Sequence, residues 1–364
     1  MSASDPIRVQ PGAANYFSHV GALDEIERFY PESSLKRVLW ISGKRAQAAA
    51  APYLPALFAS SKSTRLSFSG HCSERQVGEF VRRGSDADLV IGVGGGSALD
   101  TAKAVANRLN KPFIAIPTIA ATCAAWTPLS VWYDDDHRAL GFELFPHASH
   151  LLLVEPRIVL AAPAAYLRAG IGDTLAKWYE ARVLCERSEA SLPLTAQLGL
   201  AASLQLRDIL LADGAAALAA VASGTLNEEF LRVVDAIVAG GGLVGGLGER
   251  YTRLAAAHSI HNGLTVLAET GEFLHGTKVA YGILVQLALE GKDDELAQLA
   301  ASLEGLGLPT RLAQINVDYG EQQKIDALIA HTIRASESIH LMPGKIDADR
   351  LQRAIGKVET LAKS

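Results

Sequence analysis

The sequence predicts two parts: an α/β domain built on a parallel sheet over residues 1–163, followed by an all-helical domain over residues 164–364. In the first part short apolar runs alternate with helical patterns, which favours a parallel sheet covered on both faces. Composition shifts near residues 158–165. Beyond that point strand signals almost vanish, and segments such as 194–211 and 228–238 are rich in Ala and Leu at helical spacing, which is typical of a helix bundle.

Five apolar runs are expected to form the strands of the sheet: residues 36–42, 65–69, 88–93, 112–117 and 151–154. Helices are expected between them, notably at residues 73–83 and 98–108. In the second part the glycine-rich stretch 240–248 is interpreted as a place where helices approach closely or break.

Composition narrows the class of protein. The 364 residues carry 34 Lys and Arg against 39 Asp and Glu, a net charge of −5, which argues against a nucleic-acid partner. No stretch approaches the ~20 uninterrupted apolar residues of a membrane helix, and the first residues lack the basic and apolar segments of a secretion signal. Three widely spaced cysteines without a CxxC pair fit a reducing compartment. We therefore expect a cytoplasmic protein without a membrane or nucleic-acid partner.

A run of glycines, GVGGGS at residues 92–97, directly follows a predicted strand and precedes a helical pattern. Glycines there let the backbone approach a diphosphate, and the free N–H groups at the helix start favour its negative charge. The run differs from the GxGxxG fingerprint, and an ordinary tight turn is the alternative. A second loop, residues 117–130, also follows a strand and is rich in hydroxyl groups.

The first strand carries a clue to cofactor selectivity. It is followed by Gly43, Lys44 and Arg45, where an NAD site commonly places an acidic side chain that accepts from the ribose 2′-hydroxyl. A small residue followed by two cations instead suits a 2′-phosphate. A solvated basic turn is the alternative.

Four residues of the second part could build a metal site. Asp173 is expected at the start of a helix, His258 and His261 share a helix face at i,i+3, and His275 follows. One carboxylate and two imidazoles suit Zn²⁺ or Fe²⁺ and leave positions open for a substrate oxygen. Spacing alone leaves coincidence open, since single histidines are more often packed or surface residues.

Six segments in order resemble the iron-containing alcohol dehydrogenase superfamily, and within it the glycerol dehydrogenase-like group. They are GGGSALDTAKAV at 94–105, PTIAAT at 117–122, LSV at 129–131, AGIGDTL at 169–175, AAAHSIHNGL at 255–264 and HGTKVA at 275–280. The runs CAAWTPLSVWY at 123–133 and GDTLAKWYEA at 172–181 most resemble bacterial hydroxycarboxylate dehydrogenases. The resemblance covers nearly the whole chain and implies a Rossmann-like dinucleotide-binding domain followed by a helical domain, a dehydroquinate synthase-like fold.

The resemblance also implies roles for single residues. It assigns the metal to Asp173, His258 and His275, and it places His261 close to the metal, where it could serve in proton transfer. The remaining assignments concern the cofactor: the diphosphate at Gly95, Gly96 and Ser97 with Asp100 nearby, and the nicotinamide side at Thr118, Thr127, Leu129 and Tyr133.

Two departures from the family bear on the substrate. Glycerol dehydrogenases carry an Asp that binds polyol hydroxyls where this chain has Cys123, and the superfamily often places a fourth ligand, a His, where this chain has Lys177. Lys177 follows Asp173 by one helical turn, so both project from the same face. Our hypothesis is that Lys177 pairs with a substrate carboxylate, while the alternative is that it only screens Asp173 or reaches solvent.

Together these observations predict a metal-dependent, NADPH-preferring reductase of short 2-oxo carboxylic acids, with 2-oxobutanoate and 2-oxoglutarate implied by the resemblance. The expected cofactors are NADP(H) or NAD(H) and one divalent ion, foremost Zn²⁺ with Fe²⁺ or Ni²⁺ as alternatives. The expected partners are a small 2-oxo acid and further copies of the chain in a homo-oligomer. The alternatives are an NAD-dependent glycerol or diol dehydrogenase, a non-redox enzyme on the same fold, and a non-enzymatic dinucleotide-binding protein.

Overall fold

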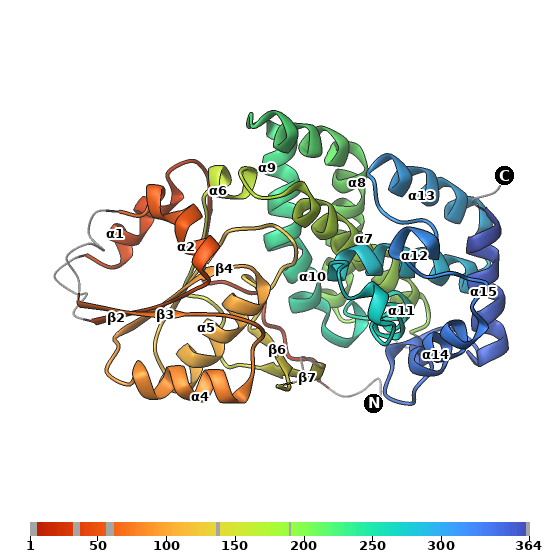
Figure 1. Cartoon of the computed structure of the whole chain (residues 1–364), viewed down its shortest axis with the longest axis horizontal. Coiled ribbons are helices and arrows are strands. Elements are labelled where there is room, and N and C mark those ends of the chain that lie inside the picture. Colours follow the sequence, from red (N-terminus) through yellow and green to blue (C-terminus); the bar gives the residue numbers. More distant parts are fainter. Residues whose placement is uncertain (1–5, 32–36, 56–61, 136–138, 189–190, 362–364) are drawn as a thin grey trace. The chain divides into compact units, whose positions relative to one another are not determined.

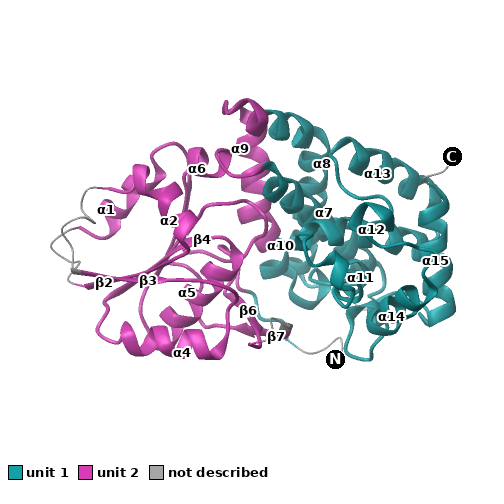
Figure 2. Cartoon of the chain, viewed as in Figure 1, with its two compact units in different colours: residues 1–9, 164–219, 244–364 teal, residues 10–163, 220–243 magenta. Residues whose placement is uncertain are grey.

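The computed structural model describes residues 6–31, 37–55, 62–135, 139–188 and 191–361. The chain divides into two compact units, which Figure 2 colours separately. We call residues 10–163 and 220–243 the α/β unit, and residues 1–9, 164–219 and 244–364 the helical unit. This grouping differs from a single division at residue 163 in two places, at 1–9 and at 220–243.

Two contacts explain why residues 220–243 group with the sheet. The Tyr16 hydroxyl donates a hydrogen bond to the Asp235 carboxylate. Gly242 lies against the ring of Trp126, where an added Cβ would come 2.9 Å from Cγ. A helical segment distant in sequence is therefore packed onto the α/β unit.

The elements of the α/β unit follow the predicted alternation of strands and helices (Figure 1). Its strands are β1 (Asn15–Ser18), β2 (Arg37–Ser42), β3 (Lys62–Ser67), β4 (Leu89–Gly94), β5 (Phe113–Pro117), β6 (Leu129–Tyr133), β7 (Ala139–Leu144) and β8 (Leu151–Val154). Its helices include α1 (Glu25–Phe29), α2 (Lys44–Ala50), α4 (Glu74–Arg83), α5 (Gly96–Leu109), α6 (Pro156–Leu160) and α9 (Glu228–Asp235).

Six strands form one parallel sheet in the order β1-β8-β5-β4-β2-β3. Every residue of β4, β5 and β8 is buried, as expected for central strands covered on both faces. Figure 1 shows α4 and α5 on one face of the sheet and α1 and α2 on the other. The predicted fold class, a parallel sheet followed by a helical part, is confirmed.

Three strands, β1, β6 and β7, were not predicted from the sequence. β1 reads NYFS and is half-buried throughout, so it lacks the apolar run that marks the central strands. β6 and β7 pair antiparallel and form a separate two-stranded sheet with a bulge at Trp132 and Tyr133. β6 alternates between buried and half-buried residues, a weaker signal than a continuous apolar run.

The helical unit contains seven α-helices longer than eight residues within its described residues: α7 (Ala164–Glu186), most of α8 (Leu194–Ser223), α11 (Ala256–Leu264), α12 (His275–Glu290), α13 (Asp293–Gly305), α14 (Gln322–Thr332) and α15 (Ala348–Leu361). The glycine-rich stretch forms α10 (Gly241–Gly248), directly after a π-helical turn at Ala236–Gly240. Gly199 of α8 lies against this helix, since an added Cβ there would come 3.3 Å from the Gly248 nitrogen. Both parts of the prediction thus have a counterpart: helices approach closely at this stretch, and the irregular turn lies just before α10.

Among the described residues one helical stretch, Glu228–Tyr251, is long and apolar enough to cross a membrane by length and composition alone. Half of its most apolar window is buried inside the protein. A core helix passes the same test, so this stretch is weak evidence for a membrane span.

Candidate functional site

The carboxyl ends of β2, β4 and β5 lie at one edge of the sheet, because these neighbouring strands are parallel. The chain runs from β2 outward to β3 and then returns to β4 on the other side of β2. The strand order therefore reverses between β2 and β4, and such a switch point is where open α/β sheets bind ligands. The loops beginning at Gly43 and Gly95 flank this switch point.

The glycine turn after β4 leaves space that any side chain would fill. A Cβ on Gly95 would come 2.7 Å from Ile119 Cδ1, and one on Gly96 would come 3.3 Å from Thr122 Oγ1. Gly94 has φ +158°, and a Cβ there would come 2.8 Å from that of Ala98. The 14-residue helix α5 begins at Gly96 with no side-chain cap, so its first N–H groups remain available. These features fit the diphosphate of a dinucleotide.

Gly43 precedes the first turn of α2, and Lys44 and Arg45 are exposed there. Neither cation forms an ion pair with another described residue. Gly94 and Ala46 are close neighbours, since a Cβ on Gly94 would lie 3.8 Å from that of Ala46. The basic turn and the glycine turn therefore lie side by side at the same sheet edge.

Asp100 faces inward rather than toward a free ligand. Its carboxylate contacts the Lys103 ammonium at 3.2 Å and accepts the Val131 N–H at 3.1 Å. Burial raises the pKa of Asp100, and Lys103 and the Val131 N–H partly offset that effect. Lys103, which is fully buried, also donates to the carbonyl oxygens of Ala124 and Leu129. This pair ties α5 to the loop after β5 and to β6.

The other predicted cofactor residues lie along that loop and β6. Thr118 is buried and donates its backbone N–H to Gly94, which fixes the start of the loop beside the glycine turn. Thr127, Leu129 and Tyr133 are partly exposed, and so is Cys123, which was predicted on the substrate side. The Tyr133 ring lies 4.7 Å from that of His71.

In the helical unit Asp173, His258 and His275 come together from α7, α11 and α12. Asp173 lies in the middle of the 23-residue helix α7, so the expectation that it starts a helix is wrong. The helix begins earlier, at Ala164, where Pro163 precedes an alanine-rich run. His275 is the first residue of α12 and His258 lies in the first turn of α11.

Two glycines bring α7 and α12 into backbone contact beside these ligands. A Cβ on Gly276 would overlap the carbonyl oxygen of Ala169 and come 2.9 Å from the Cβ of Asp173. A Cβ on Gly172 would overlap the carbonyl oxygen of Gly276. The close crossing therefore depends on glycine at both positions, and it sets His275 opposite Asp173.

The three side chains offer one ligand atom each, all within 4.8 Å of one another. Asp173 Oδ1 lies 3.4 Å from His258 Nε2 and 3.3 Å from His275 Nε2. This oxygen is buried and makes no hydrogen bond to a described residue. A buried carboxylate oxygen without a hydrogen bond is costly unless a positive group lies beside it. An Asp-His-His donor set suits a divalent ion. The residues therefore fit the metal that the sequence predicts.

The electrostatics of the site favour a cation. Burial by itself would raise the pKa of Asp173, but the imidazoles of His258 and His275 hold it well below its usual range. Glu180, also buried, has its pKa lowered by His258. Burial by itself would lower the pKa of His258, but Glu180 and Asp173 outweigh it and raise the value to about 9. Without a metal the proton on His258 therefore balances one of the two ionised carboxylates. A divalent ion would displace that proton and supply the positive charge in its place.

His261 lies beside the ligands, and both of its ring nitrogens have partners. Nε2 is 2.9 Å from His275 Nδ1, and Nδ1 is 3.1 Å from Asn262 Oδ1. Burial and then His275 hold the pKa of His261 well below its usual range, so this imidazole is neutral. Its role in proton transfer stays a prediction.

Lys177 lies one turn after Asp173 on α7 and is partly exposed. Its charge contributes to lowering the pKa values of Asp173 and Glu180, which places its ammonium within electrostatic reach of the metal ligands. Asp173 and Lys177 thus lie one turn apart within one continuous helix, while a substrate contact stays a prediction.

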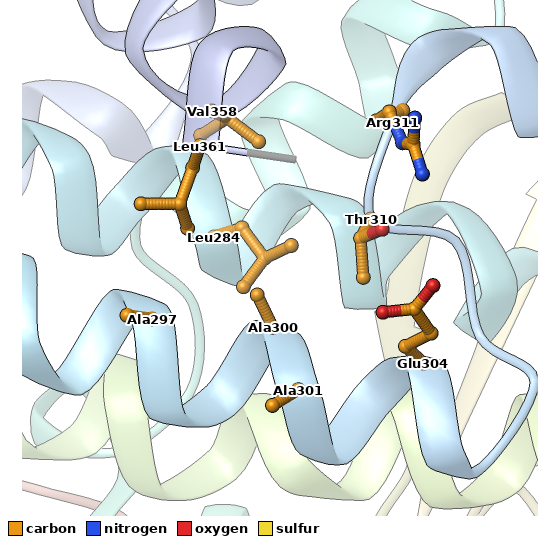
Figure 3. A pocket seen from close by; sticks show the side chains of 9 residues that line it. All are labelled: Leu284, Ala297, Ala300, Ala301, Glu304, Thr310, Arg311, Val358 and Leu361. Carbon is orange, nitrogen blue, oxygen red and sulfur yellow. The ribbon is translucent and has the colours of Figure 1, made fainter. Parts of the chain in front are cut away.

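A separate pocket of about 260 Å³ lies among α12, α13 and α15 in the same unit. Figure 3 shows apolar side chains such as Leu284 at one side and the polar groups of Glu304 and Arg311 at the other. No residue predicted for the active site lines it.

Sequence reasoning missed Glu180 and Lys103. Glu180 lies seven residues after Asp173, two helical turns on the same face, and that spacing could have suggested it. Lys103 follows Asp100 at i+3 within the mostly apolar run at residues 98–106, and a charged pair inside such a run was the available signal.

Comparison with known proteins shows the family of the chain. A family model described as iron-containing alcohol dehydrogenase matches residues 13–156. Hydroxycarboxylate dehydrogenase A of Escherichia coli (strain K12) is 55% identical over 357 residues, which cover 98% of each chain. Glycerol dehydrogenase of Pseudomonas putida is 37% identical over 296 residues, which cover 80% of each chain.

Solved structures with the same fold include a probable glycerol dehydrogenase from Sinorhizobium meliloti 1021, with a TM-score of 0.86 and 28% identity over 98% of this chain and 99% of that chain. Glycerol dehydrogenase from Schizosaccharomyces pombe has a TM-score of 0.88 and 27% identity, over 99% of this chain and 92% of that chain. Membership of the family implies a nicotinamide cofactor and a divalent metal, for which the two sites above have suitable residues. The chain belongs to the iron-containing alcohol dehydrogenase family and is a dehydrogenase related to hydroxycarboxylate and glycerol dehydrogenases.

Proposed function

We propose that this dehydrogenase interconverts short 2-oxo carboxylic acids and 2-hydroxy acids, with NADP(H) preferred over NAD(H) and one divalent ion, Zn²⁺ foremost, bound by Asp173, His258 and His275. The observation that carries the proposal is the buried, unbonded Oδ1 of Asp173 facing two imidazole Nε2 atoms. The relative named hydroxycarboxylate dehydrogenase A supports the substrate class. The candidate substrates are 2-oxobutanoate and 2-oxoglutarate.

When bound, the ion supplies Lewis acidity toward the substrate oxygen and the nicotinamide supplies the hydride. Each unit of the chain then has a separate task. The glycine turn after β4 holds the cofactor diphosphate, and its cradle would exclude a bulkier residue at Gly95. In the helical unit Glu180 holds the imidazole of His258 in place through a 2.6 Å contact with Nδ1.

Lys177 is the residue from which we propose a substrate with a carboxylate group. Its ammonium lies within electrostatic reach of Asp173, on the same helix. In our proposal this cation pairs with the carboxylate of a 2-oxo acid, a charge-assisted contact that orients the neighbouring carbonyl. A polyol or a neutral aldehyde has no group that would use it.

The cofactor preference is proposed from Lys44 and Arg45. Both are exposed beside the switch point, and Gly43 presents no acidic side chain to a ribose 2′-hydroxyl. The exposed cations suit a 2′-phosphate.

NAD-dependent oxidation of glycerol or another diol is the second candidate, favoured by the relatives and solved structures named glycerol dehydrogenase. A panel of 2-oxo acids, aldehydes and polyols, assayed with both cofactors and with or without chelator, separates the two. We expect the highest kcat/KM for a 2-oxo acid with NADPH and its loss on chelation. Higher kcat/KM for glycerol with NAD would replace the proposed function by the second.

The substrate contact is tested by Lys177→Met, which keeps the apolar stem and removes the charge. KM should rise far more for 2-oxo acids than for a neutral aldehyde, because only the acids lose an ion pair. Lys345→Met, at an exposed lysine of the same unit, is the matched control. Equal losses on acids and aldehydes would reject the carboxylate contact.

Cytoplasmic location, a homo-oligomeric state and the absence of membrane or nucleic-acid partners stay predictions.

A further inference from the structure

Both histidines of the metal site turn Nε2 toward Asp173, at 3.4 Å for His258 and 3.3 Å for His275. A neutral imidazole binds a metal only through the nitrogen that lacks a proton. Each ring must therefore carry its proton on Nδ1. The hydrogen-bond partners of each Nδ1 show which groups enforce that tautomer.

For His258 the partner is Glu180, which is fully buried. Its Oε2 lies 2.6 Å from His258 Nδ1, and an ionised carboxylate only accepts, so Nδ1 must carry the proton. Its Oε1 accepts the backbone N–H groups of Ala255 and His258, at 2.7 and 3.1 Å. These contacts at the start of α11 lock the carboxylate, since turning it would break both backbone bonds.

For His275 the connection is longer and ends on Glu337. The Glu337 carboxylate is paired with Arg334 and accepts from Asn262 Nδ2 at 2.9 Å. The amide nitrogen of Asn262 is thereby turned to Glu337, so its Oδ1 must accept from His261 Nδ1, 3.1 Å away. His261 is then left with an unprotonated Nε2, which accepts from His275 Nδ1 at 2.9 Å.

We propose that Glu180 and His261 are positioning residues that fix His258 and His275 as Nδ1–H tautomers, so that both rings offer Nε2 to a divalent ion. Glu180 acts directly on His258. Glu337 acts on His275 through a second path, the hydrogen bonds of Asn262 and His261, and it fixes which atom donates in each of them. In this arrangement His261 acts on the metal site through His275. The inference rests on the metal site of the proposed function.

Glu180 also caps α11, so loss of the cap must be distinguished from loss of the tautomer. Gln286 offers a matched control: its Oε1 accepts the Ala257 N–H at 3.1 Å in the same first turn and contacts no imidazole. Gln286→Ala therefore removes one cap of α11, together with the bonds from Gln286 Nε2 to Tyr179 and Glu290, and leaves both histidine partners in place.

The first measurement is zinc affinity of the full chain, by competition with a chelator. Glu180→Gln keeps the shape of the side chain but replaces one carboxylate oxygen with an NH₂ group. In one orientation this NH₂ group faces His258 Nδ1, and in the other it faces two backbone N–H donors. We expect zinc affinity to fall about tenfold or more, the range found for partners of metal-binding histidines. Gln286→Ala should lower the unfolding midpoint and leave zinc affinity near the wild-type value.

The second path is tested by a pair of variants at His261. His261→Leu removes the acceptor for His275 Nδ1, while His261→Gln can restore one through its amide oxygen. We expect zinc affinity to fall in His261→Leu and to recover in His261→Gln. Nitrogen-15 spectra of the zinc-saturated chain add an independent readout, because each ring should show a protonated Nδ1. Glu180→Gln should alter the signal of His258 alone, and His261→Leu that of His275 alone.

Wild-type affinity in both Glu180→Gln and His261→Leu would overturn the inference while leaving the metal site intact. So would a loss of affinity in Gln286→Ala as large as that in Glu180→Gln. A wild-type chain that binds no zinc would instead overturn the metal site, and this inference with it.

Discussion

The α/β unit and the helical unit gather their functional residues in different ways. In the α/β unit the loops after β2, β4 and β5 meet because parallel strands end at one edge, and each loop is a short continuous segment. In the helical unit Asp173, His258 and His275 come from three helices separated by up to a hundred residues of sequence. Strand topology places the first set, whereas helix crossings place the second.

This difference predicts how each region responds to substitution. A loop at a sheet edge can change one side chain without moving its neighbours, because the strands beneath it stay paired. At a crossing where backbone touches backbone, an added methyl group has nowhere to go. Changes at the cofactor loops should therefore be local, and changes at the helix crossing should spread to every ligand.

The largest effect is expected for Asp173→Asn. Loss of the negative ligand should lower kcat/KM about a thousandfold or more, equivalent to roughly 4 kcal/mol of barrier. NADPH affinity, measured by fluorescence titration, should stay near the wild-type value, because the cofactor loops belong to the other unit. A parallel loss of NADPH affinity would show that the two sites do not act separately.

The next effect concerns the crossing itself. Gly276→Ala should lower the free energy of unfolding by about 3 kcal/mol, because the new methyl group would overlap the Ala169 carbonyl oxygen. Zinc retention should fall with it. Gly305→Ala is the control: its added Cβ meets nothing within 4 Å at the end of α13, so stability should hold or rise by about 0.5 kcal/mol. Equal denaturation midpoints for the two variants would contradict the role given to Gly276.

A smaller and local effect is expected at the basic turn. The double variant Lys44→Ala, Arg45→Ala should lower the preference for NADPH over NADH about tenfold, since charge-assisted contacts to a phosphate contribute roughly 1.5–3 kcal/mol. Activity with NADH should change little. Arg82→Ala, at an exposed cation of α4, serves as the control. An unchanged ratio of the two kcat/KM values would mean that the turn is only a solvated basic segment.

The smallest expected effect is a difference in thiol reactivity among the three cysteines. Burial, assisted by Asp100, raises the pKa of Cys72 to about 12, and burial, assisted by Glu186, raises that of Cys185 to about 11. Both are protonated thiols at about pH 8, and Cys185 should gain thiolate before Cys72 as the pH rises. Cys123 is partly exposed, so mass spectrometry after iodoacetamide treatment should find it labelled. Because it lies on the loop after β5 with the predicted cofactor residues, it should be labelled less when NADPH is present. Labelling of Cys72 at the same rate as Cys123 would contradict this order.

How much the sequence could predict also differs between the units. The strands β4, β5 and β8 are continuous apolar runs, so their positions and the loops after them followed from local pattern. β1 and the β6–β7 hairpin have weaker alternation and were missed. The inward orientation of Asp100 could not be foreseen, because it depends on Val131 and on a lysine that is buried only in the folded chain.

In the helical unit the three ligands were proposed as a group from family resemblance. The structure brings their side chains together, and metal binding there stays a prediction. Their partners could not be found in this way. Asn262 reaches Glu337 across 75 residues, and Glu180 reaches His258 across 78. Contacts at such separations depend on how α7, α11 and the segment after α14 pack, and helical periodicity carries no information about that.

The contact between Gly172 and Gly276 has a practical consequence for handling the enzyme. The backbone positions of Asp173 and His275 are set by main-chain contact between α7 and α12, so we expect them to be the same with and without a bound ion. Preparations that differ in metal occupancy should consequently share one fold and melt cooperatively, while differing in specific activity. Comparing batches by protein concentration would then mislead, and rates should be normalised to moles of metal per chain.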